Sequence, residues 1–112
     1  MKPMYRPDLG DDTGRAFQVE GGYVEYRYAP GGTTEVVNIH VNSRLRRTGV
    51  GRKLMSLVEN QDHTKAVYGF TAADNRIAHD FYKALGYQLY EIPNYYGRGH
   101  NAFVFHKVVK EE

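Results

Sequence analysis

The sequence predicts a mixed α/β domain in which two helices pack on a single β-sheet. Residues 23–29 place their side chains on two faces with a period of two, which is typical of a half-buried strand. Apolar residues between Val50 and Val58 recur instead with the spacing of a helix. The predicted elements follow one another as β-β-β-α-β-α-β-β. This order requires right-handed crossovers in its central part and antiparallel hairpins at its ends.

Composition restricts the class of protein. The chain has 112 residues, of which 41% are hydrophobic and 25% are charged, as in a soluble globular domain with one core. No run approaches the ~20 apolar residues of a membrane helix. The N-terminus shows no signal peptide, so we expect a cytoplasmic location. The absence of cysteine excludes a disulfide scaffold, a thiol nucleophile and a zinc–thiolate site, and the five histidines lack metal-ligand spacing, so we predict no metal.

The N-terminal part of the chain is predicted to be an irregular arm followed by three strands. Residues 1–15 are rich in proline, glycine and aspartate, and we expect residues 16–112 to form a single domain. The three strands are separated by glycine-rich turns and are expected at residues 16–20, 23–29 and 35–42. In the third strand, simple alternation places Val37, Ile39 and Val41 on one face.

The C-terminal part is predicted to contain two helices and three strands. The first helix is expected from about Gly49 to about Asn60. The second helix begins at an N-cap, Asp74 or Asn75, and ends before Gly86, which suits the C′ position. The remaining strands are expected at residues 66–71, 87–92 and 102–109, with a loop of turn-forming residues at 93–100.

A basic, glycine-containing turn, Arg46-Arg47-Thr48-Gly49-Val50-Gly51, joins the third strand to the first helix. The first turn of a helix presents unpaired N–H groups and a partial positive charge, so it holds phosphate well. Glycine at positions 49 and 51 lets the backbone approach an anion, and Arg46, Arg47, Arg52 and Lys53 can neutralise it. The alternatives are an ordinary turn with solvated arginines and a basic module that binds nucleic acid. The net charge of only +2 argues against nucleic acid as a partner.

Two motifs together resemble those of the GNAT (GCN5-related N-acetyltransferase) superfamily. Arg46, Gly49 and Gly51 fill the fixed places of the acyl-CoA-binding signature [QR]-x-x-G-x-[GA]. The second signature is an asparagine leading a helix that ends in aromatic-x-x-Leu-Gly-aromatic, and it is similar to the segment from Asn75 to Tyr87. The resemblance covers about residues 16–109. It implies a GNAT-like mixed sheet with the helices packed on it.

The resemblance also implies that acetyl-CoA is the cosubstrate and that particular residues bind it. Residues 39–41 would supply the strand edge along the pantetheine arm, and Asn75 would bond that arm or serve only as a helix N-cap. Tyr82 matches the tyrosine that protonates the leaving sulfur in many members, although it could instead be core material. The cofactor-binding residues implied in this way are Ile39, Val41, Arg46, Arg47, Thr48, Gly49, Val50, Gly51, Arg52, Asn75 and Tyr82.

The general base is less clearly indicated than the cofactor site. Glu35 lies at the spacing from Arg46 at which histone-type members carry a catalytic glutamate, but it could also be an exposed acid at a strand end. His40 is the second candidate, because imidazole exchanges protons near neutral pH. By alternation it shares a face with Val36 and Asn38. Ribosomal-protein N-terminal acetyltransferases carry their glutamate where this chain has Phe70.

The resemblance predicts an acetyl-CoA-dependent N-acetyltransferase that acts on a primary amine of a protein or peptide. Tyr95 and Tyr96 lie in a loop that resembles the loop of the ribosomal-protein enzymes that closes over the acceptor peptide, so we expect them to bind substrate. Typical members begin with a further strand and two helices, so an open acceptor site, or one completed by a partner subunit such as a second copy in a homodimer, is expected. We expect no membrane partner. The alternatives are an acetyltransferase for a polyamine, amino acid or aminoglycoside, and a non-catalytic CoA-binding regulatory protein.

Overall fold

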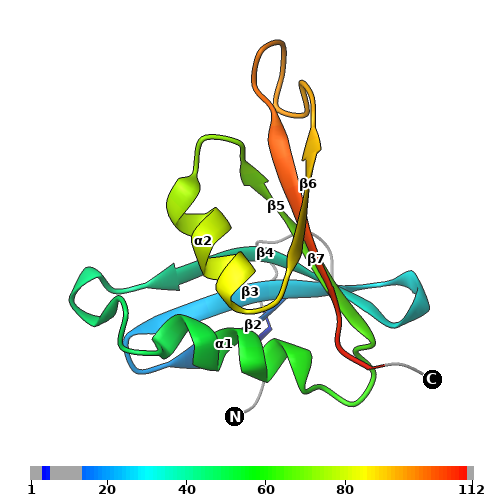
Figure 1. Ribbon diagram of the computed structural model, residues 1–112. Coiled ribbons are helices and arrows are strands. Elements are labelled where there is room, and N and C mark those ends of the chain that lie inside the picture. Colours follow the sequence, from blue (N-terminus) through cyan, green and yellow to red (C-terminus); the bar gives the residue numbers. More distant parts are fainter. Residues whose placement is uncertain (1–3, 6–13, 111–112) are drawn as a thin grey trace.

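The computed structural model describes residues 4–5 and 14–110, which form one seven-stranded mixed sheet with two α-helices (Figure 1). The strand order is β1-β2-β3-β4-β5-β7-β6. The strands are β1 (Met4–Tyr5), β2 (Gly14–Val19), β3 (Gly22–Ala29), β4 (Thr33–Val41), β5 (Ala66–Ala72), β6 (Gln88–Ile92) and β7 (Ala102–Val108). The helices are α1 (Val50–Glu59) and α2 (Arg76–Ala84), with short 3₁₀ turns at Pro30–Gly32 and Ser43–Leu45. The predicted β-β-β-α-β-α-β-β order is confirmed for β2 to β7.

The first part of the chain differs from the predicted arm. Met4–Tyr5 pairs antiparallel with β2 at residues 15–16, so Met4 and Tyr5 belong to the sheet. The strand β2 also begins at Gly14, two residues earlier than expected, because its whole length pairs with β3. The rest of the predicted arm, apart from residues 14–15, lies outside the described residues.

A β-bulge in β4 changes which residues share a face. In the ladder between β3 and β4, Tyr26 pairs with Val36 and the preceding residue, Glu25, pairs with Asn38, which leaves Val37 as an extra residue. The alternation therefore reverses after Val36. Ile39 now shares a face with Val36, so the prediction that Val37, Ile39 and Val41 face one way is wrong for Val37, which is 41% exposed.

The parallel pairing of β4 with β5 is short. It runs from Thr33 opposite Ala66 to Val36 opposite Gly69 and then stops, while β5 continues against β7 as far as Ala72. Gly69 lies at this end point, where a Cβ would be 2.8 Å from the Val36 carbonyl oxygen and 2.2 Å from the Phe105 ring. The two strands therefore separate after Val36 and Gly69, and the edge of β4 beyond this point loses its partner.

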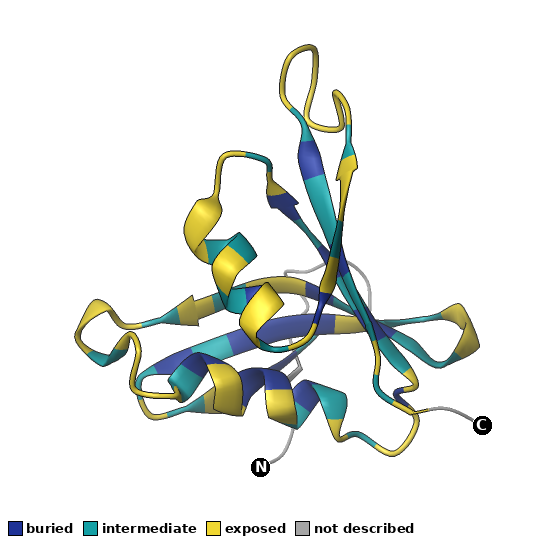
Figure 2. Cartoon of the chain, in the orientation of Figure 1, coloured by how far each residue is buried: buried dark blue, intermediate teal, exposed yellow. Residues whose placement is uncertain are grey.

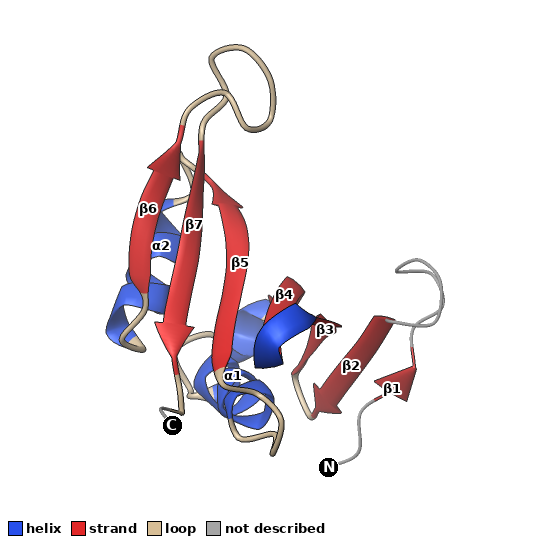
Figure 3. Ribbon diagram, turned by 90° about the vertical axis from the view of Figure 1, so that its right-hand side faces the viewer, coloured by secondary structure: helices blue, strands red, loops and turns tan. Residues whose placement is uncertain are grey.

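Both helices lie on the same face of the sheet (Figures 1 and 3). The helix α1 packs on β2, β3 and β4, and α2 packs near β6. Figure 2 shows the buried residues along the centres of the strands and the inner side of α1. The core residues contributed by the helices and the turn after α2 are Leu54, Met55, Val58, Tyr82 and Tyr87. Among the residues that the structure describes, neither helix combines the length and apolar character needed to cross a bilayer.

Candidate functional site

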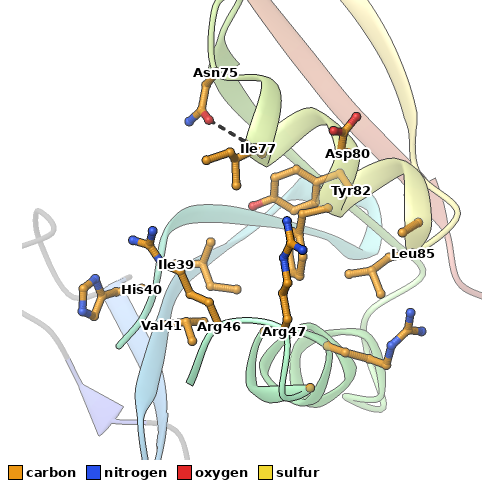
Figure 4. Close-up of a pocket in the computed structure, with 16 residues that line it drawn as sticks. Ile39, His40, Val41, Arg46, Arg47, Asn75, Ile77, Asp80, Tyr82 and Leu85 are labelled. Carbon is orange, nitrogen blue, oxygen red and sulfur yellow. Dashed lines mark hydrogen bonds between the residues drawn. The ribbon is translucent and has the colours of Figure 1, made fainter. Parts of the chain in front are cut away.

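A groove of about 1030 Å³ opens where β4 leaves β5 (Figure 4). Its walls come from the end of β4, the turn before α1, the first turn of α1 and one side of α2. This volume is at the upper end of the range for small-molecule and cofactor sites. The residues that line it are Ile39, His40, Val41, Arg46, Arg47, Gly49, Gly51, Arg52, Asn75, Ile77, Ala78, Asp80, Phe81, Tyr82, Ala84 and Leu85.

The N-terminus of α1 is the basic end of the groove. Gly49 is the N-cap residue and has a φ of 93°, in the left-handed region that glycine adopts without strain. The first helical bond runs from the Lys53 N–H to the Gly49 carbonyl, so the preceding amides of α1 have no intrahelical acceptor. A glycine N-cap has no side-chain oxygen to accept from them. Arg46, Arg47 and Arg52 line the same end, so amides and guanidinium groups combine into a site suited to an anion.

Gly51 has a different role from the one that the sequence suggests. It is buried, and a Cβ at this position would lie 2.8 Å and 3.0 Å from two ring carbons of Phe81. The missing side chain therefore lets α1 and α2 approach each other at the floor of the groove. At Gly49, by contrast, a Cβ would meet open space, so only the positive φ of that residue requires glycine.

The middle of the groove is apolar. Ile39 and Val41 of β4 face Phe81 and Leu85 of α2 across it, and all four are partly buried against the core. Ile77 in the first turn of α2 is 77% exposed and also lines the groove, although periodicity alone would place it on the buried side of α2. An apolar wall beside a cationic end suits a ligand with a charged head and a long uncharged arm.

Tyr82 belongs to both the core and the groove. Its ring is 3% exposed and stacks on Phe105, with 3.7 Å between ring centroids and 10° between planes. Its hydroxyl points into the groove between Ile39 and Ile77 (Figure 4). Within the described residues this hydroxyl has no hydrogen-bond partner. Burial raises the pKa of the Tyr82 phenol above its ordinary value, so the group stays protonated at neutral pH.

Asn75 caps α2 and also lines the groove. Its Oδ1 accepts a hydrogen bond from the Ala78 N–H at 3.1 Å, which confirms the N-cap interpretation and decides between Asp74 and Asn75. The side-chain amide nitrogen is not used by this cap. It is therefore available to a ligand in the groove, so the two suggested roles of Asn75 are compatible.

Glu35 lies on the other face of the sheet and does not line the groove. Arg27 of β3 donates from Nε to its Oε1 at 2.7 Å, and the Tyr68 hydroxyl of β5 donates to the same oxygen at 3.4 Å. The Glu35 side chain is 13% exposed, so it is not the open strand-end acid of the alternative interpretation. Burial and the Glu35 carboxylate raise the pKa of the Tyr68 phenol, which sequence reasoning did not single out.

His40 lies at the groove edge and points away from Tyr82 (Figure 4). Its imidazole stacks on Tyr23 with 5.5 Å between ring centroids. The bulge at Val37 puts His40 on the face of Asn38 but not on that of Val36, so the expectation that all three share a face is wrong.

Tyr95 and Tyr96 belong to the loop between β6 and β7, which stands out beyond the end of the sheet (Figure 1). They are 49% and 50% exposed. Tyr95 stacks on Phe70 of β5, with 4.7 Å between centroids and 8° between planes, and its ring meets Tyr96 edge-on. Burial raises the pKa of the Tyr96 phenol.

The groove thus brings together most of the predicted cofactor residues and the edge residue His40. Thr48 and Val50 are the predicted cofactor residues that do not line the groove: Thr48 bonds back to Leu45, and Val50 packs on the core. Glu35 and the loop tyrosines lie apart from Tyr82. Glu35 is next to Val36, the last residue of β4 that pairs with β5, and Phe70 is the first residue of β5 beyond that pairing.

Comparison with known proteins identifies the family of the chain. The family model of the acetyltransferase (GNAT) family matches residues 19–87, more than half of the chain, including both motifs up to Tyr87. The chain belongs to the GNAT acetyltransferase family. The matched region of this GNAT domain includes the whole groove described above.

Individual relatives agree with the family assignment. The N-terminal acetyltransferase B complex catalytic subunit naa20 of Schizosaccharomyces pombe is 38% identical over 71 residues, which cover 60% of this chain and 39% of the relative. Ard1 from Thermoplasma volcanium is 25% identical with a TM-score of 0.73, over 89% of this chain and 72% of that one. An aminoglycoside 6′-N-acetyltransferase complexed with coenzyme A has the same fold at 16% identity, with a TM-score of 0.74 over 89% and 75% of the chains. The GNAT domain thus spans about two fifths of the curated relative that it matches.

Proposed function

We propose that this GNAT chain transfers the acetyl group of acetyl-CoA to a primary amine of a protein or peptide. The observation that carries the proposal is the separation of β4 from β5 after Val36 and Gly69. It opens a groove with the uncapped N-terminus of α1 at one end and the Tyr82 hydroxyl in its wall. Membership in the acetyltransferase family gives this geometry its chemical interpretation.

The residues present fit acetyl-CoA. The first amides of α1 and the guanidinium groups of Arg46, Arg47 and Arg52 would hold the pyrophosphate. Ile39, Val41 and the apolar side of α2 would enclose the pantetheine arm. When bound, the cosubstrate supplies a thioester carbonyl that an amine can attack.

The free edge of β4 would orient the pantetheine arm and the thioester. Backbone N–H and C=O groups need partners wherever they are withdrawn from water. Residues 38–41 of β4 still pair with β3 on one side, but they no longer pair with β5 on the other. Their groups on that side can bond the amides of the arm and the developing oxyanion, for which one preorganised donor contributes ~3 kcal/mol.

Tyr82 would stabilise the leaving sulfur. Its phenol is protonated at neutral pH because burial raises its pKa. Even at an ordinary phenol pKa of ~10, complete proton transfer to a thiolate with a pKa near ~8.5 costs about 2 kcal/mol. We therefore assign to Tyr82 a hydrogen bond to the sulfur as it gains negative charge, with no full ionisation of the phenol.

Glu35 is our candidate for the base that accepts the proton of the amine, and His40 is the second candidate. Support for Glu35 comes from its place beside the strand separation and from the way its carboxylate is held. Arg27 and Tyr68 both donate to Oε1, which leaves Oε2 as the acceptor for a proton, directly or through water. His40 is held instead by its stack on Tyr23, farther along β4.

The preference for a protein or peptide acceptor rests on the β6–β7 loop and on the curated relative. Tyr95 and Tyr96 present half-exposed rings on the loop, and the 38% identical relative is an N-terminal acetyltransferase subunit. An assay of CoA thiol release would compare peptides that differ at their first residues with a panel of polyamines, amino acids and aminoglycosides. We expect release with peptides. Release with small amines alone would overturn the acceptor assignment, and CoA binding without release for any amine would indicate a regulatory CoA-binding protein.

A further inference from the structure

The contact between Phe70 and Tyr95 joins the face of the sheet that carries Glu35 to the β6–β7 loop. We propose that Phe70 is a positioning residue that fixes Tyr95, and with it the loop, for a peptide acceptor. This inference rests on the proposed function and adds to it a residue that carries no polar group.

The position of Phe70 in the sheet supports this role. Phe70 is the first residue of β5 beyond the last pair with β4, so its ring lies at the opening between the strands. It faces away from Gly69 and Phe105, which lie on the helix side. Tyr68, two residues earlier on the same face, meets the Phe70 ring edge-on at 6.1 Å and donates to Glu35. One continuous row of side chains therefore leads from the candidate base to the loop.

The construction of the loop explains why one stack can fix it. Residues 94–101 are closed on themselves: Asn101 accepts from the Asn94 N–H at 2.8 Å, and the Asn94 side chain accepts from the Gly99 N–H at 2.8 Å. Asn101 also donates to Glu91 in β6 at 3.0 Å, at the base of the loop. The stack of Tyr95 on Phe70 is the ring contact that connects this unit to β5. The Ala73 N–H, directly after β5, also donates to the Asn101 carbonyl at 3.0 Å, at the base of the unit. A loop that is rigid inside and held at its base can change its tilt as a whole when the ring contact nearer its tip is lost.

The stack should therefore affect peptide acceptors more than the binding of acetyl-CoA. Tyr82, the arginines and the rest of the groove lie on the helix side and make no ring contact with Phe70 or Tyr95 among the described residues. Stacked aromatic pairs contribute enough that losing one should raise the peptide KM roughly 2- to 10-fold. The KM for acetyl-CoA and the kcat at saturating peptide should stay the same.

The experiment combines steady-state kinetics with a probe that needs no activity. Phe70→Leu removes the ring, Phe70→Tyr keeps it, and Tyr95→Leu removes its partner. We expect the peptide KM to rise in Phe70→Leu and to rise at least as much in Tyr95→Leu, which also removes a ring expected to bind substrate. The double mutant should have the same peptide KM as Tyr95→Leu alone, and Phe70→Tyr should have the normal KM. Trypsin cleavage after the exposed Arg98, followed by mass spectrometry, should accelerate in the same variants. Tyr90→Leu removes a half-exposed tyrosine of β6 whose hydroxyl donates to Gln88, its one side-chain hydrogen bond within the described part of the chain. This variant should change neither quantity.

Several results would overturn the inference. Effects of Phe70→Leu and Tyr95→Leu that multiply in the double mutant would mean that the two rings act independently. An unchanged cleavage rate at Arg98 in folded Phe70→Leu would mean that Phe70 does not hold the loop, whatever the activity. If the wild-type chain acetylates no amine, the proposed function fails, and the kinetic part of the inference fails with it. Normal folding of each variant is checked by its thermal unfolding midpoint.

Discussion

Replacing Tyr82 by phenylalanine removes one oxygen atom from the groove and leaves the core intact. The ring is 3% exposed and stacks on Phe105 at 3.7 Å, and phenylalanine keeps this contact. The hydroxyl has no hydrogen-bond partner among the described residues, so its removal leaves no buried group unpaired. We therefore expect the free energy of unfolding to change by less than ~0.5 kcal/mol.

The catalytic effect follows from the bond that Tyr82 would make to the leaving sulfur. A hydrogen bond to a charged group contributes ~1.5–3 kcal/mol. Since ~1.4 kcal/mol corresponds to tenfold in rate, Tyr82→Phe should lower kcat between ~10-fold and ~150-fold. The KM for acetyl-CoA should hardly change, because the bond strengthens only as the sulfur gains charge.

Tyr87→Phe is the matched control for this substitution. Tyr87 is 4% exposed and lies 5.5 Å from Tyr82 between ring centroids, but its hydroxyl donates to Glu59 at 2.7 Å on the side away from the groove. Because the lost bond is to a carboxylate, this variant should lose ~1.5–3 kcal/mol of stability and keep its kcat. The assay is thiol release with saturating peptide, together with urea unfolding of both variants. Wild-type turnover in Tyr82→Phe would refute the catalytic assignment and make Tyr82 a packing residue only.

Three further predictions test other parts of the structure. Gly51→Ala should lose ~1 kcal/mol of stability in urea unfolding. Its new Cβ would lie 2.8 Å from Phe81, and this overpacking costs ~1–3 kcal/mol, whereas the higher helix propensity of alanine contributes only ~1 kcal/mol. A stabilised variant would contradict the close contact between the two helices. Glu35→Gln should lower kcat/KM for peptides ~100-fold or more without changing the acetyl-CoA KM, and an unchanged pH–rate profile would transfer the base role to His40. Burial raises the pKa of the Tyr26 and Tyr87 phenols, so the folded chain keeps protons that the unfolded chain releases above its phenol pKa of ~10. The free energy of unfolding therefore keeps its full contribution from these tyrosines below pH ~10, and above pH ~10 it should fall by ~1.4 kcal/mol per pH unit for each of them. A free energy of unfolding that stays constant between pH ~10 and ~11.5 would contradict their burial.

Local patterns were sufficient to predict the order of elements from β2 to β7. Val50, Leu54 and Val58 repeat with the helical period, and all three pack on the core as α1. Asn75 and Gly86 mark the two ends of α2 through local backbone chemistry, so a single sequence predicts both.

Features that depend on neighbouring strands could not be predicted in this way. The bulge at Val37 leaves no mark in composition, because its effect is one unpaired residue in a ladder with β3. It reverses which face of the sheet the residues after Val37 point to, so that His40 and Val36 lie on opposite faces. Simple alternation fails wherever such an extra residue enters a strand.

Contacts between segments far apart in the sequence could not be predicted either. Gly51 has the pattern of an anion-binding glycine, whereas its nearest potential contact is Phe81, far along the chain in α2. Tyr68 and Phe70 are ordinary residues of a short apolar strand by pattern, and they gain a role only through Glu35 and Tyr95. The alternation of side chains in β5 could have shown that Tyr68 and Phe70 share a face, but it could not have shown their partners.

A crystal structure of the chain grown with millimolar coenzyme A tests the central claim most directly. The account predicts pyrophosphate oxygens within hydrogen-bond distance, ~3 Å, of the first amides of α1, and the sulfur beside the Tyr82 hydroxyl. A groove that stays empty, or a coenzyme bound elsewhere with its sulfur away from Tyr82, would contradict the account.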